Sequence, residues 1–377
     1  MHGKPEGAKA AEGIWQILGN VTQVLEVHVG KIQAVGKGLH ADAFESFRTG
    51  AALGSVNCMN ELAVCLAGVE GCPQDLIAAV ALVRGVQKLL GSSAVFKNQL
   101  GAVIARVYYN LRESARQNEE YAKAAEWLQN AADNGHAGAQ YELGQTFEYD
   151  QENLEEAVAW YEKAADQGNI GALVALGLCY KFSKGVEENI VEAAALFRKA
   201  AEAGNDTAQY HLGECYDKGE GVPQNAAEAA AWYEKAAAQG HVDAQYNLAL
   251  CYDNGRGRAQ SNAKAAVWCK KAAEQGHVTA QYNLAISYAC DMGVAFNPVE
   301  SAKWYRKAAE QGHREAMRAL GVCYEFGDGV PLDAKEALVW YEKAADLGHP
   351  GAQADAEELK KENECLESCL LKLGYDV

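Results

Sequence analysis

The chain has 377 residues, 49% of them hydrophobic and 23% charged, which is ordinary for a folded protein but too long for one compact core. Its net charge of −17 repels phosphate backbones and anionic lipid, so we exclude nucleic acid as a partner. No apolar run approaches 18 residues, the polar start is unlike a secretory signal, and the eleven cysteines form no disulfide framework. We therefore expect no membrane insertion and a reducing, cytoplasmic location.

The N-terminal segment, 1–40, is expected to form an amphipathic capping helix. Its apolar side chains recur at spacings of four and three residues from Ile14 to Val35, which places them on one stripe of a helix. We expect this stripe to cover the exposed face of the structure that follows. The alternative is a self-assembling structural protein in which 14–35 forms a coiled coil and makes a homodimer.

Segment 41–118 carries weaker signs of paired helices. Gly54 is followed eight residues later by the apolar pair Leu62 and Ala63, and a second such stretch begins at Leu90 with its register shifted by about one residue. We expect two degenerate helical repeats in this segment.

A strict repeat governs 119–353. One position, which we call the tryptophan slot, recurs first after 33 residues and then five times after 36 residues, and a glycine follows each slot by eight residues. The slot residues are Trp127, Trp160, Leu196, Trp232, Trp268, Trp304 and Trp340. Such self-similarity indicates stacked units, each too small to bury its apolar face alone.

Each unit of the repeat is expected to contain two helices. The first follows the glycine and ends at a glycine-rich loop, and the second starts seven residues before the tryptophan slot and ends at the next glycine. The second helix begins at a good N-cap residue in each repeat. These residues are Asn153, Asn189, Asn225, Ser261, Asn297 and Asp333. The last segment, 354–377, is expected to form a C-terminal capping helix and tail.

The repeat unit resembles the Sel-1-like repeat, a relative of the tetratricopeptide repeat with a longer loop between its helices. The resemblance covers about 121–353 and rests on Gly240-His241, Ala244 to Ala249, Gly255-x-Gly257, Ala265-x-x-Trp268 and Lys271 to Gly276. It implies an all-α, right-handed superhelical α-solenoid of about seven regular repeats plus about two degenerate N-terminal ones. It also implies a non-catalytic scaffold or adaptor, without a cofactor, that binds a protein or peptide on a concave face.

Three other patterns are better explained by the repeat than by chemistry. Ser261-x-x-Lys264 matches the nucleophile motif of serine β-lactamases, but Ser261 is an N-cap position and no S-D-N or K-T-G motif occurs. A β-lactamase-like hydrolase is therefore a remote alternative. The histidines after the repeat glycines are too far apart to share a metal, and we expect them to join one helix to the next. Four cysteines share one position of the first helix and are expected to be buried: Cys179, Cys215, Cys251 and Cys323.

The first helices supply the predicted binding surface. By comparison with tetratricopeptide-like arrays, the concave stripe falls six, ten and thirteen residues after each repeat glycine, and we call these positions the first-helix stripe. The candidate partner-binding residues on or beside it are Tyr141, Tyr210, Glu214, Asp217, Tyr246, Asn247, Leu250, Asp253, Tyr282, Asn283, Ile286 and Arg318. This mixture favours a partner with apolar anchors and basic flanks. The alternative, that the tyrosines pack between neighbouring first helices, is compatible with this role.

Overall fold

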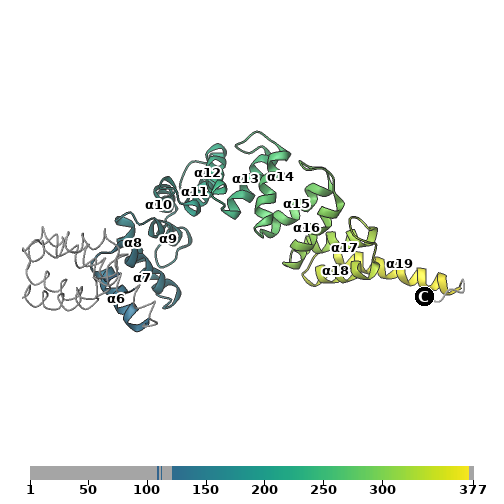
Figure 1. Cartoon of the computed structure of the whole chain (residues 1–377), viewed down its shortest axis with the longest axis horizontal. Coiled ribbons are helices and arrows are strands. Elements are labelled where there is room, and N and C mark those ends of the chain that lie inside the picture. The colour runs from purple at the N-terminus through teal and green to yellow at the C-terminus, as the bar shows by residue number, and fades with distance from the viewer. Residues whose placement is uncertain (1–107, 110–111, 113–120, 373–377) are drawn as a thin grey trace, which may run out of the picture. The chain divides into compact units, whose positions relative to one another are not determined.

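The computed structural model of the chain describes residues 108–109, 112 and 121–372. The predicted capping helix in 1–40, its dimerisation stripe and nearly all of the segment predicted to hold degenerate repeats lie outside these residues. Every regular element within 121–372 is an α-helix (Figure 1). None of the helices described there has the length and apolar character that a membrane span requires.

The helices alternate between the two kinds that the repeat predicts. The second helices are α6 (Tyr121–Asp133), α8 (Leu154–Asp166), α10 (Ile190–Glu202), α12 (Ala226–Ala238), α14 (Asn262–Glu274), α16 (Pro298–Glu310) and α18 (Ala334–Asp346). The first helices are α7 (Ala137–Tyr149), α9 (Ile170–Phe182), α11 (Asp206–Lys218), α13 (Val242–Asn254), α15 (Val278–Ala289) and α17 (Arg314–Phe326), and α19 (Ala352–Lys372) ends the series.

The chain divides into two units, 1–189 and 190–377, each of which stacks its helices in chain order. In the first unit α6, α7, α8 and α9 pack successively, and in the second each helix from α10 to α19 packs on the next. This nearest-neighbour packing of helix pairs confirms the predicted α-solenoid.

Five of the second helices begin at their predicted N-caps. The side-chain oxygens of Asn153, Asn225, Ser261, Asn297 and Asp333 each accept a hydrogen bond from a backbone N–H two or three residues later. This bond satisfies a donor that the first turn of a helix otherwise leaves without a partner.

The first helices begin at the residue that follows each repeat glycine. In α13 the Nδ1 atom of His241 accepts a hydrogen bond from the N–H of Ala244 at 3.3 Å. In α11 the side chain of Asn205 does the same for Ala208 at 2.8 Å. The glycine before His241, Gly240, has a φ of +101°, a conformation that favours glycine. The histidines therefore join consecutive helices as predicted, and they do so as N-caps.

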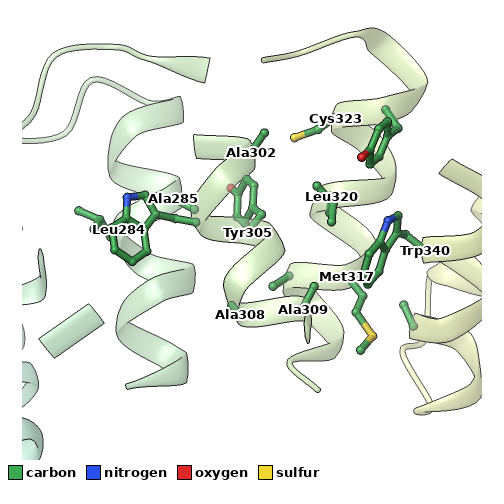
Figure 2. Close-up of a cluster of buried hydrophobic side chains, with 14 of the residues drawn as sticks. Leu284, Ala285, Ala302, Tyr305, Ala308, Ala309, Met317, Leu320, Cys323 and Trp340 are labelled. Carbon is green, nitrogen blue, oxygen red and sulfur yellow. The ribbon is translucent and has the colours of Figure 1, made fainter. Parts of the chain in front are cut away.

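The core is built from alanines, one leucine per repeat and the residue directly after each tryptophan slot, a position that we call the aromatic slot. Tyr233 lies in this slot against Gly213 of α11, so closely that a methyl group on the glycine would come within 2.7 Å of the ring. Where the glycine is replaced by Ala285, the ring of Tyr305 still lies between Ala285 and Leu320 (Figure 2). The described residues of this slot include Tyr161, Phe197, Tyr233, Cys269, Tyr305 and Tyr341.

Buried glutamines join the two helices of a repeat to the helix before them. The Nε2 atom of Gln245 on α13 donates to the carbonyl of Ala237 on α12, and its Oε1 accepts from Gln275 at the end of α14 at 2.8 Å. Three further pairs repeat this arrangement: Gln140 with Gln167, Gln209 with Gln239, and Gln281 with Gln311. Because each buried amide has a partner, the stack avoids the cost of unsatisfied polar groups.

Helix α19 packs on α18 at the end of the second unit. Ala352, Ala356 and Leu359 are buried, and Asp355 pairs with Arg318 of α17. The segment predicted to form a C-terminal capping helix is thus helical as far as Lys372.

Candidate functional site

The stripe tyrosines of the second unit stack on the histidine N-caps of the following first helices. Each ring is half-buried, so the alternative that these tyrosines pack between repeats describes part of their role. In the second unit the pairs are Tyr210–His241, Tyr246–His277 and Tyr282–His313, with ring centroids 4.7, 4.4 and 4.6 Å apart. Removing these rings would therefore disturb the stack of helices as well as the surface.

The acidic residue of the stripe, thirteen positions after the repeat glycine, has internal partners in other repeats. In the first unit the hydroxyl of Tyr161 donates to Glu148 at 2.7 Å, and Lys184 forms an ion pair with Glu148 at 3.4 Å. In the second unit Arg256 forms an ion pair with Asp217 at 2.9 Å. Tyr161 occupies the aromatic slot, whereas Lys184 and Arg256 lie in the loop of the next repeat.

The repeat of α13 and α14 lacks both kinds of partner for its acidic residue, Asp253. Its aromatic slot holds Cys269, and the loop position equivalent to Lys184 and Arg256 holds Met292. Within the described part of the chain, no side chain pairs with the Asp253 carboxylate. The carboxylate is exposed to solvent, so its charge remains available to a molecule outside the array.

A pocket of about 230 Å³ opens where the aromatic slot holds Cys269. Helices α13, α14 and α15 form its walls, and Met292 lies at the loop that follows α15. Its lining residues are Tyr246, Ala249, Leu250, Asp253, Asn262, Ala265, Ala266, Cys269, Asn283, Ile286, Ser287 and Met292. The pocket therefore combines an apolar wall with amide, hydroxyl and carboxylate groups, as ligand pockets commonly do.

The Cys269 thiol in this pocket is suited to packing rather than to nucleophilic chemistry. It donates a hydrogen bond to the carbonyl of Ala280 at 3.2 Å, and burial raises its pKa to about 12. A thiol with so high a pKa contains almost no thiolate near neutral pH, and the thiolate is the reactive form.

Five of the twelve predicted partner-binding residues line this one pocket: Tyr246, Leu250, Asp253, Asn283 and Ile286. Tyr210, Glu214 and Asp217 lie on the neighbouring helix α11, and Asn247 lies on α13 beside the Tyr210 hydroxyl. Tyr282 is on α15.

The other two predicted residues lie at separate pockets. Arg318 lines a pocket of about 300 Å³ one repeat later, where Ala289 occupies the acidic position of the stripe. Tyr141 is in the first unit and lines a third pocket with Glu142 and Gln145.

Cys269 and Met292 belong to the site but were not among the sequence predictions. Both differ from other repeats, since Cys replaces an aromatic residue and Met stands where Lys184 and Arg256 carry a cation, a position that holds Glu220 and Asp328 in two further repeats. Aligning the second helices and the loops of successive repeats, in addition to the first helices, would have drawn attention to both positions.

The patterns weighed as catalytic have structural roles here. The Ser261 hydroxyl accepts a hydrogen bond from the N–H of Lys264 at 3.4 Å as the N-cap of α14. The cysteines at the shared first-helix position are buried, as predicted, and all described cysteines are free thiols. No cluster of three or more metal-ligating side chains occurs among the residues that the structure describes.

A family model described as Sel1 repeat matches seven consecutive stretches of the chain. The stretches are 98–136, 137–169, 170–205, 206–241, 242–277, 278–313 and 314–349. The chain belongs to the Sel1 repeat family. The predicted resemblance is thus confirmed, and the first Sel1 repeat extends into the segment predicted to be degenerate.

Two solved structures with Sel1-type folds are similar to this Sel1 repeat chain. One is c5321, a protective antigen of uropathogenic Escherichia coli, with 30% identity and a TM-score of 0.66 over 85% of this chain and 67% of that chain. The other is a Sel1 repeat protein of Oxalobacter formigenes, with 28% identity and a TM-score of 0.58 over 87% and 92% of the two chains. Among curated proteins, none matched the chain.

Proposed function

We propose that this protein is a non-catalytic scaffold or adaptor that binds a partner protein or peptide along the first-helix stripe. Sel1 repeat proteins are generally protein-interaction scaffolds. The observation that carries the proposal is the pocket between α13, α14 and α15, because it gathers four stripe residues and the adjacent Asn283 around one concave, partly apolar site.

The charge of the protein supports a partner with basic segments. The net charge is −17, and the exposed carboxylate of Asp253 lies in the wall of the pocket. Opposite charge on a partner would speed its approach and favour one orientation on the stripe. A cytoplasmic location is part of this proposal and is supported by the free thiols of the described cysteines.

The test compares two sets of three aliphatic-to-arginine substitutions. The stripe variant changes the position ten residues after the repeat glycine: Leu250→Arg, Ile286→Arg and Val322→Arg. The control variant changes exposed valines of the second helices: Val267→Arg, Val299→Arg and Val339→Arg, which are 55%, 60% and 41% exposed. Both variants add the same charge, so a difference between them reports on the location of the binding surface.

Each protein is immobilised and used to capture partners from the source cells, with mass spectrometry to identify them and circular dichroism to verify folding. We expect the wild type and the control variant to retain the same partner and the stripe variant to lose it. Retention of that partner by a folded stripe variant would refute binding along the stripe.

A further inference from the structure

We propose that the pocket between α13, α14 and α15 binds an aromatic side chain of the partner, next to a lysine or arginine of the same segment that pairs with Asp253. This inference rests on the proposed scaffold function and specifies the side chains that the partner presents. It follows from two positions at which this repeat departs from other repeats of the array, and from the polar groups of the pocket wall.

The first departure concerns the ring. The aromatic slot holds tyrosine or phenylalanine in the repeats on both sides, and those side chains are buried in the core, whereas the thiol of Cys269 fills much less volume. The opposing residue on α13 is Ala249, where Gly213 faces Tyr233 one repeat earlier. The cavity of about 230 Å³ exceeds the roughly 150 Å³ in which apolar protein cavities bind benzene, so it can take a substituted aromatic ring.

The second departure concerns the cation. Arg256 and Lys184 neutralise the acidic stripe residues of the repeats that precede their loops, but Met292 stands at the equivalent position and leaves Asp253 without a cation. A lysine or arginine of a bound segment would pair with Asp253 as Arg256 pairs with Asp217. Because the carboxylate is exposed, the pair would add selectivity more than affinity.

The third feature is the polar part of the pocket wall. Asn283 donates from its Nδ2 atom to the hydroxyl of Tyr246 at 3.3 Å, and Ser287 lies one turn further along α15. These groups can form hydrogen bonds with the hydroxyl of an incoming tyrosine. They are not left without hydrogen-bond partners when no ligand occupies the pocket. An anionic ligand is disfavoured by the Asp253 carboxylate, so the pocket suits a protein side chain better than a phosphate.

The experiment uses three blocked dipeptides and the full chain. They are acetyl-Arg-Tyr-amide, acetyl-Glu-Tyr-amide and acetyl-Arg-Ala-amide, titrated while the methyl resonances of Leu250 and Ile286 are followed by NMR. We expect acetyl-Arg-Tyr-amide to shift both methyls in a saturable manner. The peptide without a ring should bind at least about 10-fold more weakly, because it lacks the apolar area that an aromatic side chain buries. The glutamate peptide should bind about 2- to 5-fold more weakly, the range of an exposed ion pair.

Two variants locate the binding. Cys269→Tyr combined with Ala249→Gly fills the pocket with the pair that the chain itself uses at Tyr233 and Gly213, and it should abolish the methyl shifts. Met292→Arg provides an internal cation for Asp253 and should remove the preference for the arginine peptide while leaving the ring bound. Because Met292 is exposed, this second variant should fold even if the filled pocket does not.

The results separate the pocket from the wider function. The assignment would be overturned if the Leu250 and Ile286 methyls shifted as much in the filled variant as in the wild type. It would also be overturned if the wild type bound the arginine and glutamate peptides with equal affinity. If the filled variant keeps the partner captured by the wild type while the stripe variant loses it, the scaffold function stands and the pocket assignment fails. If the stripe variant also keeps the partner, the proposed function itself fails.

Discussion

Lowering the pH from 8 to 5 is expected to weaken the second unit through its histidine N-caps. The Nδ1 atoms of His241, His277 and His313 accept hydrogen bonds from backbone N–H groups at 3.3, 3.0 and 3.2 Å. A protonated imidazole has two N–H donors and no acceptor, so the cap exists only when the ring is neutral. Burial lowers the pKa of all three imidazoles below 6.5.

The sign of the effect follows from proton linkage. Between the folded pKa and the unfolded value near 6.5, the unfolded chain binds more protons than the folded chain, so the free energy of unfolding rises with pH. The stabilisation is complete above pH 6.5 and is lost as the pH falls below it. Asp243, whose carboxylate is 3.6 Å from Nε2 of His277, and Glu315 beside His313 oppose the shift, but burial is the larger effect.

The magnitude comes from the caps themselves. A side-chain N-cap contributes about 1 kcal/mol, so three caps contribute about 3 kcal/mol to the unit. With a urea dependence of about 3 kcal/mol/M, losing them lowers the unfolding midpoint by about 1 M. Urea unfolding followed by circular dichroism at pH 8, 7, 6 and 5 measures this change.

The matched control replaces all three histidines by asparagine, the cap that the chain uses at Asn169 and Asn205. The variant His241→Asn, His277→Asn and His313→Asn keeps a cap that does not titrate, although it loses the stacking of each imidazole on its tyrosine. We therefore expect a lower midpoint at pH 8 but a flatter dependence on pH. Midpoints of the two proteins that fall in parallel from pH 8 to pH 5 would refute the role of the caps.

Three further changes test the core. Gln281→Met should lower the free energy of unfolding by about 1–3 kcal/mol, because the buried Gln281 side chain loses its hydrogen bonds with the Ala273 carbonyl and Gln311, and adding Gln311→Leu should cost little more in urea unfolding because that bond is already lost; additive losses would contradict the pairing. Gly213→Ala should lower the free energy of unfolding by about 1–3 kcal/mol through overpacking against Tyr233, and adding Tyr233→Cys should relieve the clash; a stabilised single variant would be inconsistent with this contact. Asn297→Ala should cost about 1 kcal/mol as a lost N-cap, measured in the same way, and an unchanged midpoint would argue against the cap.

Much of the fold could be predicted from the sequence because its determinants are local and periodic. The caps at Asn225 and Ser261 and the helix-ending Gly240 act within a few residues of their own position, and the 36-residue register shows where each applies. The stacking of Tyr246 on His277 was less accessible, because the two residues share a face only once the repeats are stacked.

The pocket depends on contacts that no local pattern describes. Asp253, Cys269 and Met292 lie on two helices and a loop from two repeats, and each is unremarkable by itself. That they form one site becomes clear only from the structure, in which the equivalent residues of other repeats contact one another. The first-helix stripe did contain four of the lining residues, with Asn283 beside it, since the helical spacing alone places them on one face.

The pairing of the buried Gln245 with Gln275 has a consequence for the evolution of the array. Gln245 and Gln275 both belong to the stretch 242–277, and the remaining bond goes to a backbone carbonyl, at Ala237, which any preceding copy provides. Recombination that deletes or duplicates such a cassette therefore leaves no buried amide orphaned. The ion pair of Asp217 with Arg256 does cross the border between cassettes. Changes in copy number would thus preserve the interior while generating new combinations of charge on the surface.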